Sequence, residues 1–269
     1  MSLYRRTLQH FFPAGIFALT LATPALAQPK HGLPCPARTI TLGASEFGSF
    51  YRNGAGMDKD IAELLASRSG CKIEIRTLLR GQIWREMQAG TLDMTLSAIA
   101  TPERMSFSWA TPYLWMKNKI ILSKDVDPAI RTPQDFIAAS NLRFGIVRGN
   151  YAGKYYEELT TQLRNIARVE EVANTDQLYA MFKAGRFQAM LGPALVYSTY
   201  LNDKQARVED WAPSAPKESA NLLLSKKSFN KEEAKRWADL MKTMANDGTL
   251  LHIFERYTSP GEAAKLLIP

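Results

Sequence analysis

The sequence predicts an α/β fold of two lobes, each a mainly parallel sheet flanked by helices, joined by two hinge strands. Strand-like apolar runs alternate with helical periodicity over short links, a pattern that implies parallel sheets with right-handed crossovers. The alternation restarts after an extended run at 119–123. Residues 82–96 also align with residues 177–191, with identical Gln, Ala, Gly and final Leu. Two lobes of one architecture explain both observations.

Three strands and two helices are predicted in the first lobe. Met57, Ile61 and Leu64 recur at helical spacing, and Gly70 follows where a helix can end. The strands are predicted at 39–42, 72–75 and 92–96, and a second helix, around 83–87, ends at Gly90.

The second lobe repeats this order. Thr132 and Pro133 suit the cap and the first turn of a helix. Strands are predicted at 119–123, 142–147, 167–172 and 187–191, with helices at 151–163 and 176–183. An extended run at 220–224, a helix at 231–246 and a short helix ending at Tyr257 then return the chain to the first lobe.

A chain that leaves the first lobe once and returns once crosses between the lobes twice. The predicted crossing strands are 119–123 and 220–225, with lobe 1 at 28–122 and 218–269 and lobe 2 at 123–217. Two crossing strands make a hinge, and a hinge between compact lobes makes a cleft that can close on a small ligand.

The N-terminal segment predicts an exported protein. Arg5 and Arg6 precede an apolar stretch at 11–22, and Ala25 and Ala27 supply the small residues that a signal peptidase reads. The alternative is a membrane anchor, but the stretch is shorter than the roughly 20 apolar residues of a span and is interrupted by proline. We therefore expect a signal peptide at 1–27 and a periplasmic mature protein.

Cysteine usage and charge narrow the function classes. Export places Cys35 and Cys71 in an oxidising compartment, where we expect a disulfide; two unpaired buried thiols are the alternative. Neither the cysteine spacing nor the isolated His31 and His252 indicates a metal site, and no cofactor is expected. The net charge is +8, but Lys and Arg are scattered, which argues against nucleic acid and leaves an anionic ligand open.

Several short motifs follow one another in a fixed order along the chain. They are G-M-D-K-D-I at 56–61, G-T-L-D-M at 90–94, T-P-E-R at 101–104, F-S-W at 107–109, T-P-Y at 111–113 and D-G-T-L at 247–250. This series resembles the bacterial extracellular solute-binding proteins of family 3, type II periplasmic binding proteins that serve polar amino-acid importers. The resemblance implies a binding cleft, a small anionic or zwitterionic ligand and an inner-membrane ABC permease as partner. The sequence shows no sign of oligomerisation and no catalytic set of residues, so we also expect a monomer without enzymatic activity.

Arg104 is the leading candidate for ligand binding. Thr101 and Pro102 suit the start of a helix, whose first turn presents free N–H groups. The guanidinium of Arg104 can then hold a carboxylate through two hydrogen bonds, and the resemblance implies that it binds an α-carboxylate. An ordinary surface arginine is the alternative.

The remaining candidates follow the ends of strands. Gly149, Asn150 and Tyr151 form a strand-to-helix turn whose N–H groups could complete a carboxylate clamp, or a plain turn. The resemblance places an aromatic ligand contact at Phe47 or Phe50, although core packing is a realistic alternative for Phe50. Further ligand contacts are expected at Ser97, Ile99, Thr101 and Gly192.

Gly192 is the main departure from the family pattern. It stands where members that bind α-amino acids have an Asp that pairs with the ligand ammonium, and a buried ammonium without a counter-charge is costly. Three interpretations follow: a carboxylate ligand without an α-amine, an amine partner supplied by Glu46, or a cleft that serves a protein partner.

Three function classes therefore stay open. The leading one is the binding subunit of an ABC importer for a small carboxylate-bearing solute, such as an amino acid or a related organic acid. The second is an accessory or sensor protein of the same fold without a transport role. The third is a periplasmic dehydratase of cyclic carboxylates, for which Glu46 would be the acid.

Overall fold

The computed structural model describes Leu33 and residues 35–268. The predicted signal peptide at 1–27 lies outside the described residues. None of the helices within this part of the chain has the length and apolar character needed to span a membrane.

The first sheet contains five strands in the order β2-β1-β3-β10-β4. β1 is parallel to β2 and β3, whereas β10 is antiparallel to β3 and β4. The strands are β1 (Ile40–Ala44), β2 (Ile73–Thr77), β3 (Met94–Ile99), β4 (Ser108–Met116) and β10 (Glu218–Ser225). The helices that accompany it are α1 (Met57–Ser69), α2 (Arg80–Ala89), α3 (Pro102–Phe107), α8 (Lys231–Asn246), α9 (Thr249–Glu255) and α10 (Pro260–Leu266).

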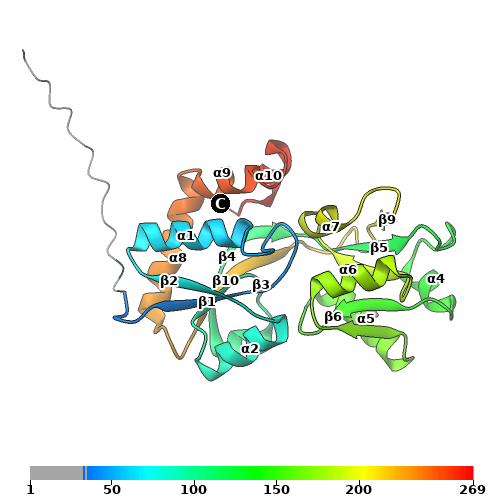
Figure 1. Cartoon of the computed structure of the whole chain (residues 1–269), viewed down its shortest axis with the longest axis horizontal. Helices are drawn as coiled ribbons and strands as arrows, with labels where there is room; N and C mark the ends of the chain where they lie inside the picture. The colour runs from blue at the N-terminus through cyan, green and yellow to red at the C-terminus, as the bar shows by residue number, and fades with distance from the viewer. Residues whose placement is uncertain (1–32, 34, 269) are drawn as a thin grey trace, which may run out of the picture. The chain divides into compact units, whose positions relative to one another are not determined.

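Strand β10, which lies between β3 and β4, is buried on both faces. Leu222 and Leu224 pack in one apolar cluster together with α1 and α8, whereas Leu223 points to the opposite face and packs with Ile83 and Met87 of α2. Figure 1 accordingly shows α1 and α2 on opposite sides of the sheet. Side chains alternate along a strand, so helices on both faces explain why β10 has three consecutive buried leucines at 222–224.

The second sheet has the order β7-β6-β8-β5-β9. Here β6 is parallel to β7 and β8, and β5 is antiparallel to β8 and β9. The strands are β5 (Lys119–Ser123), β6 (Phe144–Val147), β7 (Val169–Val172), β8 (Ala189–Gly192) and β9 (Ala206–Glu209), and the helices are α4 (Pro133–Ala138), α5 (Lys154–Asn165), α6 (Thr175–Lys183) and α7 (Ala194–Tyr200). The predicted α/β fold with two sheets is confirmed, and each sheet is mixed, with a parallel trio and antiparallel partners.

The internal sequence similarity between residues 82–96 and 177–191 has a structural counterpart. Residues 82–96 run through α2 into β3, and residues 177–191 run through α6 into β8. β3 and β8 occupy the same place in their sheets, beside β1 and β6 respectively. The repeated helix–glycine–strand pattern therefore marks equivalent units of the two sheets.

The chain passes from one sheet to the other through short connecting segments and not within the strands. β5 lies wholly in the second sheet and β10 wholly in the first, so the chain crosses between Met116 and Lys119 and again between Glu209 and Glu218. The prediction that 119–123 and 220–225 are themselves the crossing segments is corrected accordingly. We propose that lobe 1 ends near residue 118 instead of 122 and that lobe 2 ends before Glu218.

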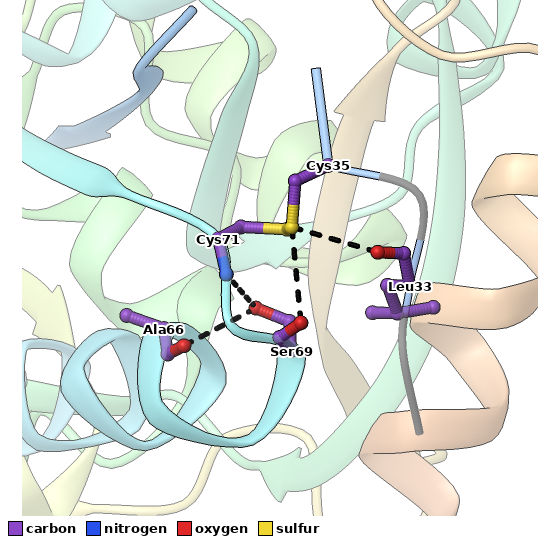
Figure 2. Close-up of a disulfide and its surroundings, with 5 residues drawn as sticks. All are labelled: Leu33, Cys35, Ala66, Ser69 and Cys71. Atoms are coloured by element: carbon purple, nitrogen blue, oxygen red, sulfur yellow. Dashed lines mark hydrogen bonds between the residues drawn. A yellow bond between two sulfur atoms is a disulfide. The ribbon is translucent and has the colours of Figure 1, made fainter. Parts of the chain in front are cut away.

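The two cysteines form the predicted disulfide. Cys35 precedes β1, Cys71 precedes β2, and the parallel pairing of these strands brings the two Cα atoms to 5.2 Å (Figure 2). A disulfide sulfur carries no hydrogen, so the approaches of the Cys35 sulfur to the carbonyl oxygens of Leu33 and Ser69 (3.5 and 3.7 Å) are van der Waals contacts. The bridge fixes the segment before β1 to the end of α1.

Candidate functional site

A cavity of about 70 Å³ is lined by residues from both halves of the chain. The first half contributes Phe47, the end of β3, Arg104 and the first turn of α2. The second half contributes parts of β6 and β8 and the turn after β6. Small-molecule sites usually measure about 300–1,000 Å³, so the walls must move apart when a solute enters.

Arg104 lies in this cavity and is held there by its own helix. Thr101 caps α3 by accepting a hydrogen bond from the Arg104 backbone N–H, and Pro102 occupies the first turn. Nη1 of Arg104 donates to the carbonyl of Ile99 at 2.8 Å, and Nη2 donates to the carbonyl of Gly149 at 2.9 Å. Burial, reinforced by neighbouring positive charge, lowers the pKa of Arg104 to about 10, so the group stays charged at neutral pH.

The turn after β6 presents a carbonyl to Arg104. The prediction that Gly149 to Tyr151 opens a helix is wrong, because α5 begins only at Lys154 and the Asn150 N–H donates to Val147. Gly149 has a φ of 82°, and a side chain there would meet the backbone of Gly81 at 3.0 Å. Only glycine fits this approach. Asn150 and Tyr151 line the cavity, and their predicted contact with a ligand stays a prediction.

The predicted aromatic contacts divide between the cavity and the core. Phe47 lines the cavity and stacks on Phe50, with ring centroids 5.3 Å apart. Phe50 is fully buried and belongs to the core of the first half. The geometry favours Phe47 as the residue that a solute would meet.

Ser97 and Ile99 end β3 at the cavity wall. The Ser97 hydroxyl donates to Asp58 at 2.6 Å and lies 3.0 Å from the Tyr113 hydroxyl, so it already has partners in the protein. Burial raises the pKa of Asp58 to about 7, although the Ser97 hydrogen bond and the charge of Arg80 oppose the shift.

Glu46 does not line the cavity that holds Arg104. Its carboxylate accepts from the Asn53 N–H and faces an adjoining cavity. Gly192 lies in the Arg104 cavity, and a Cβ built on it would stand 3.1 Å from the Tyr179 hydroxyl. The position of the expected acid is thus partly filled by Tyr179.

Sequence reasoning missed four charged or aromatic residues of the cavity: Arg80, Trp84, Glu157 and Arg164. Arg80 and Trp84 lie in the first turns of α2, directly after β2, where parallel strands open towards a ligand. That position is the signal that could have identified them. Glu157 is the only carboxylate that lines the cavity in the described chain, and it pairs with Arg164 at 3.3 Å.

The chain matches the family model for bacterial extracellular solute-binding proteins, family 3, over residues 45–260. The chain belongs to this family. Arginine-binding extracellular protein ArtP of Bacillus subtilis (strain 168) is 22% identical over 238 residues, which cover 86% of this chain and 91% of ArtP.

Solved structures of amino-acid-binding proteins share the fold. The amino-acid ABC transporter substrate-binding protein AbpA of Streptococcus pneumoniae, bound to L-arginine, has a TM-score of 0.68 at 18% identity and covers 84% of this chain and 95% of its own. AncCDT-1, an ancestral amino-acid-binding protein described as a precursor of cyclohexadienyl dehydratase, has a TM-score of 0.67 at 22% identity, with 81% and 94% covered. At these identities the likeness establishes the architecture and leaves the ligand to the residues of the cavity.

Proposed function

We propose that this protein is the periplasmic solute-binding component of an ABC-type importer and that it binds a small carboxylate-bearing solute. The observation that carries the proposal is Arg104. It is a buried guanidinium in a cavity between the two halves of a family 3 fold, and within the described residues its side-chain hydrogen bonds go only to neutral carbonyls. A carboxylate forms charge-assisted hydrogen bonds about twice as strong as those to a carbonyl, so it can displace Gly149 from Arg104.

The solute is proposed to be an acid and not arginine. ArtP and AbpA are named for arginine or bound to it. The cavity of this chain is lined by Arg80, Arg104 and Arg164, with Glu157 as the opposing charge. A cationic side chain would be repelled there, and Gly192 offers no carboxylate to an ammonium group.

The same contacts disfavour a dehydratase. General acid catalysis needs a carboxyl group within hydrogen-bond reach of the substrate. Glu46 faces the adjoining cavity and accepts from Asn53, while Glu157 is paired with Arg164. We therefore propose binding without turnover.

Thermal unfolding and isothermal titration calorimetry against a panel of carboxylates and amino acids test this function. We expect at least one carboxylate to raise Tm, and we expect Arg104→Ala to abolish that shift. Arg186→Ala, which removes an exposed arginine, is the control. A wild-type protein that no small solute stabilises, or an Arg104→Ala protein with unchanged affinity, would contradict the proposal and favour an accessory or sensor role.

A further inference from the structure

Arg80 is a buried guanidinium that the proposed carboxylate contact leaves unused. It is the first residue of α2, its relative exposure is 7%, and it lines the cavity that holds Arg104. Its guanidinium carbon lies 5.3 Å from the Phe47 ring centroid and 5.9 Å from that of Trp84. Aromatic faces stabilise a cation there but accept none of its five N–H groups in conventional hydrogen bonds.

Among the described residues, no side chain or carbonyl forms a hydrogen bond or an ion pair with Arg80. Its pKa is lowered by burial, and the negative charge of the Asp58 carboxyl opposes that shift. The Asp58 carboxylate accepts a hydrogen bond from the Ser97 hydroxyl and makes no direct ion pair with the Arg80 guanidinium. A buried charge without a bonded partner is costly, and an anion in the cavity supplies that partner.

Arg80 and Arg104 approach the same indole ring. The guanidinium carbon of Arg104 lies 3.9 Å from the Trp84 ring centroid, so both arginines lie within 6 Å of it. The two positive charges near one ring repel each other, and Arg80 contributes to the lowered pKa of Arg104. The only cavity carboxylate in the described residues, Glu157, is paired with Arg164.

We propose that Arg80 is a second anion-binding residue and that the solute is a small dicarboxylate, with one carboxylate on Arg104 and the other on Arg80. This inference rests on the proposed function and specifies its substrate class. The methylene groups between the two carboxylates lie against Phe47 and Trp84, whose rings border the same cavity. The absence of an acid at Gly192 is then expected, because such a solute carries no ammonium group.

Calorimetric titration of the intact mature protein with succinate, glutarate and butyrate tests the inference. We expect a dicarboxylate to bind at least about 10-fold more tightly than butyrate, because the second carboxylate adds charge-assisted hydrogen bonds. Arg80→Gln should weaken dicarboxylate binding by about 10- to 100-fold and remove the preference over butyrate. Arg85→Gln is the matched control, since it deletes an exposed arginine from the same helix and should leave all affinities unchanged.

The outcomes separate this inference from the proposed function. If wild-type protein binds butyrate as tightly as succinate and glutarate, or if Arg80→Gln keeps the dicarboxylate preference, the inference is wrong and the carboxylate-binding function stands. If no carboxylate binds, both fail. Should Arg80→Gln unfold, as judged by circular dichroism, Arg80→Lys replaces it. Lys keeps the charge but not the planar pair of donors, so we expect a loss of several-fold confined to the dicarboxylates.

Discussion

Arg104 donates from Nη2 to the carbonyl oxygen of Gly149 over 2.9 Å and so joins α3 to the turn after β6. The same oxygen accepts a second hydrogen bond, 2.8 Å long, from the indole N–H of Trp84. One carbonyl of the second half is therefore held by two donors of the first half. We propose that a solute carboxylate binds Arg104 in competition with this carbonyl, and we therefore expect solute binding and the contact between the halves to be coupled.

The hydrogen bond between Trp84 and Gly149 predicts that its loss will weaken the closure of the two halves on each other. Trp84→Phe removes the indole donor and keeps an aromatic face beneath Arg104. A net hydrogen bond contributes about 0.5–1.5 kcal/mol, so we expect the ratio of closed to open molecules in the solute-free protein to fall roughly 2- to 10-fold. Small-angle X-ray scattering should show a larger radius of gyration for this variant.

Trp109→Phe is the matched control for closure. The Trp109 indole donates to the carbonyl of Phe229 at 3.0 Å, and both residues belong to the half of the chain that carries the first sheet. This variant loses the same kind of bond without touching the contact between the halves. An equal change in radius of gyration for both variants would show that the Trp84–Gly149 bond has no special part in closure.

The sequence predicted the fold well because its signals are local and periodic. The bounds of β5 and α8 agree with the predicted ranges, and Thr132 caps α4 as expected. β4 was missed because the motif residues at 108–116 were interpreted as a signature and not as a strand. α5 was placed three residues early, because the turn at Gly149 and the cap at Gly153 cannot be told apart by apolar spacing.

The site was predicted only in part, because burial and pairing depend on tertiary contacts. Arg104 was identified from the T-P-E-R motif and Phe47 from the family resemblance, and both line the cavity. Asp93 of the G-T-L-D-M motif has a structural role, since it receives two hydrogen bonds from Arg38 and one from the Thr41 N–H. The position of Arg80 directly after β2 marks it as a candidate, but its distinctive property, burial without a hydrogen-bond or ion-pair partner among the described residues, depends on tertiary contacts.

The disulfide predicts a measurable stabilisation. Cys35 and Cys71 are 36 residues apart in the sequence, and a closed loop of this size contributes roughly 3–4 kcal/mol in the chain-entropy model. We expect dithiothreitol to lower the free energy of unfolding in urea by that amount. A protein with both cysteines replaced by serine should be less stable by a similar amount and insensitive to the reductant. An unchanged urea midpoint on reduction would contradict this prediction.

Asp58 predicts a decline in stability as pH rises. Burial raises its pKa to about 7 in the folded protein, whereas the unfolded chain releases the proton near pH 4. Between these values the folded state holds more protons, so stability falls from pH 4 to pH 7 and stays lower above, by up to about 4 kcal/mol. Asp93 has the opposite effect on stability, over a lower range of pH. Burial opposes its charged form, but hydrogen bonds from Arg38 and Thr41 prevail and lower its pKa to about 2.

Urea unfolding at pH 5 and pH 8 measures the contribution of Asp58. Asp58→Asn keeps an acceptor for the Ser97 hydroxyl and removes the titration, so we expect the stability difference between the two pH values to shrink. Asp239→Asn, which changes an exposed carboxylate of α8, should leave the wild-type difference in place. The prediction fails if the Asp58→Asn protein loses as much stability at pH 8 as the wild type.

We expect the Gly192→Asp substitution to shift ligand preference towards acids that carry an α-ammonium group. The substitution places a carboxylate at the cavity wall, where it can pair with an α-ammonium group. The Tyr179 hydroxyl, 3.1 Å from the new Cβ, must move slightly to admit it. That hydroxyl is buried without a hydrogen-bond partner among the described residues, so the carboxylate also gives it an acceptor. We expect the affinity ratio of glutamate to glutarate to rise about 10-fold in calorimetric titrations.

Gly192→Asn separates charge from shape in that experiment. The amide has nearly the same size as the carboxylate and meets Tyr179 in the same way, but it cannot neutralise an ammonium group. We expect it to leave the ratio of glutamate to glutarate close to the wild-type value. If Asn raises the ratio as much as Asp does, then packing against Tyr179 controls selectivity, and the missing acid at position 192 does not explain a preference for acids without an α-amine.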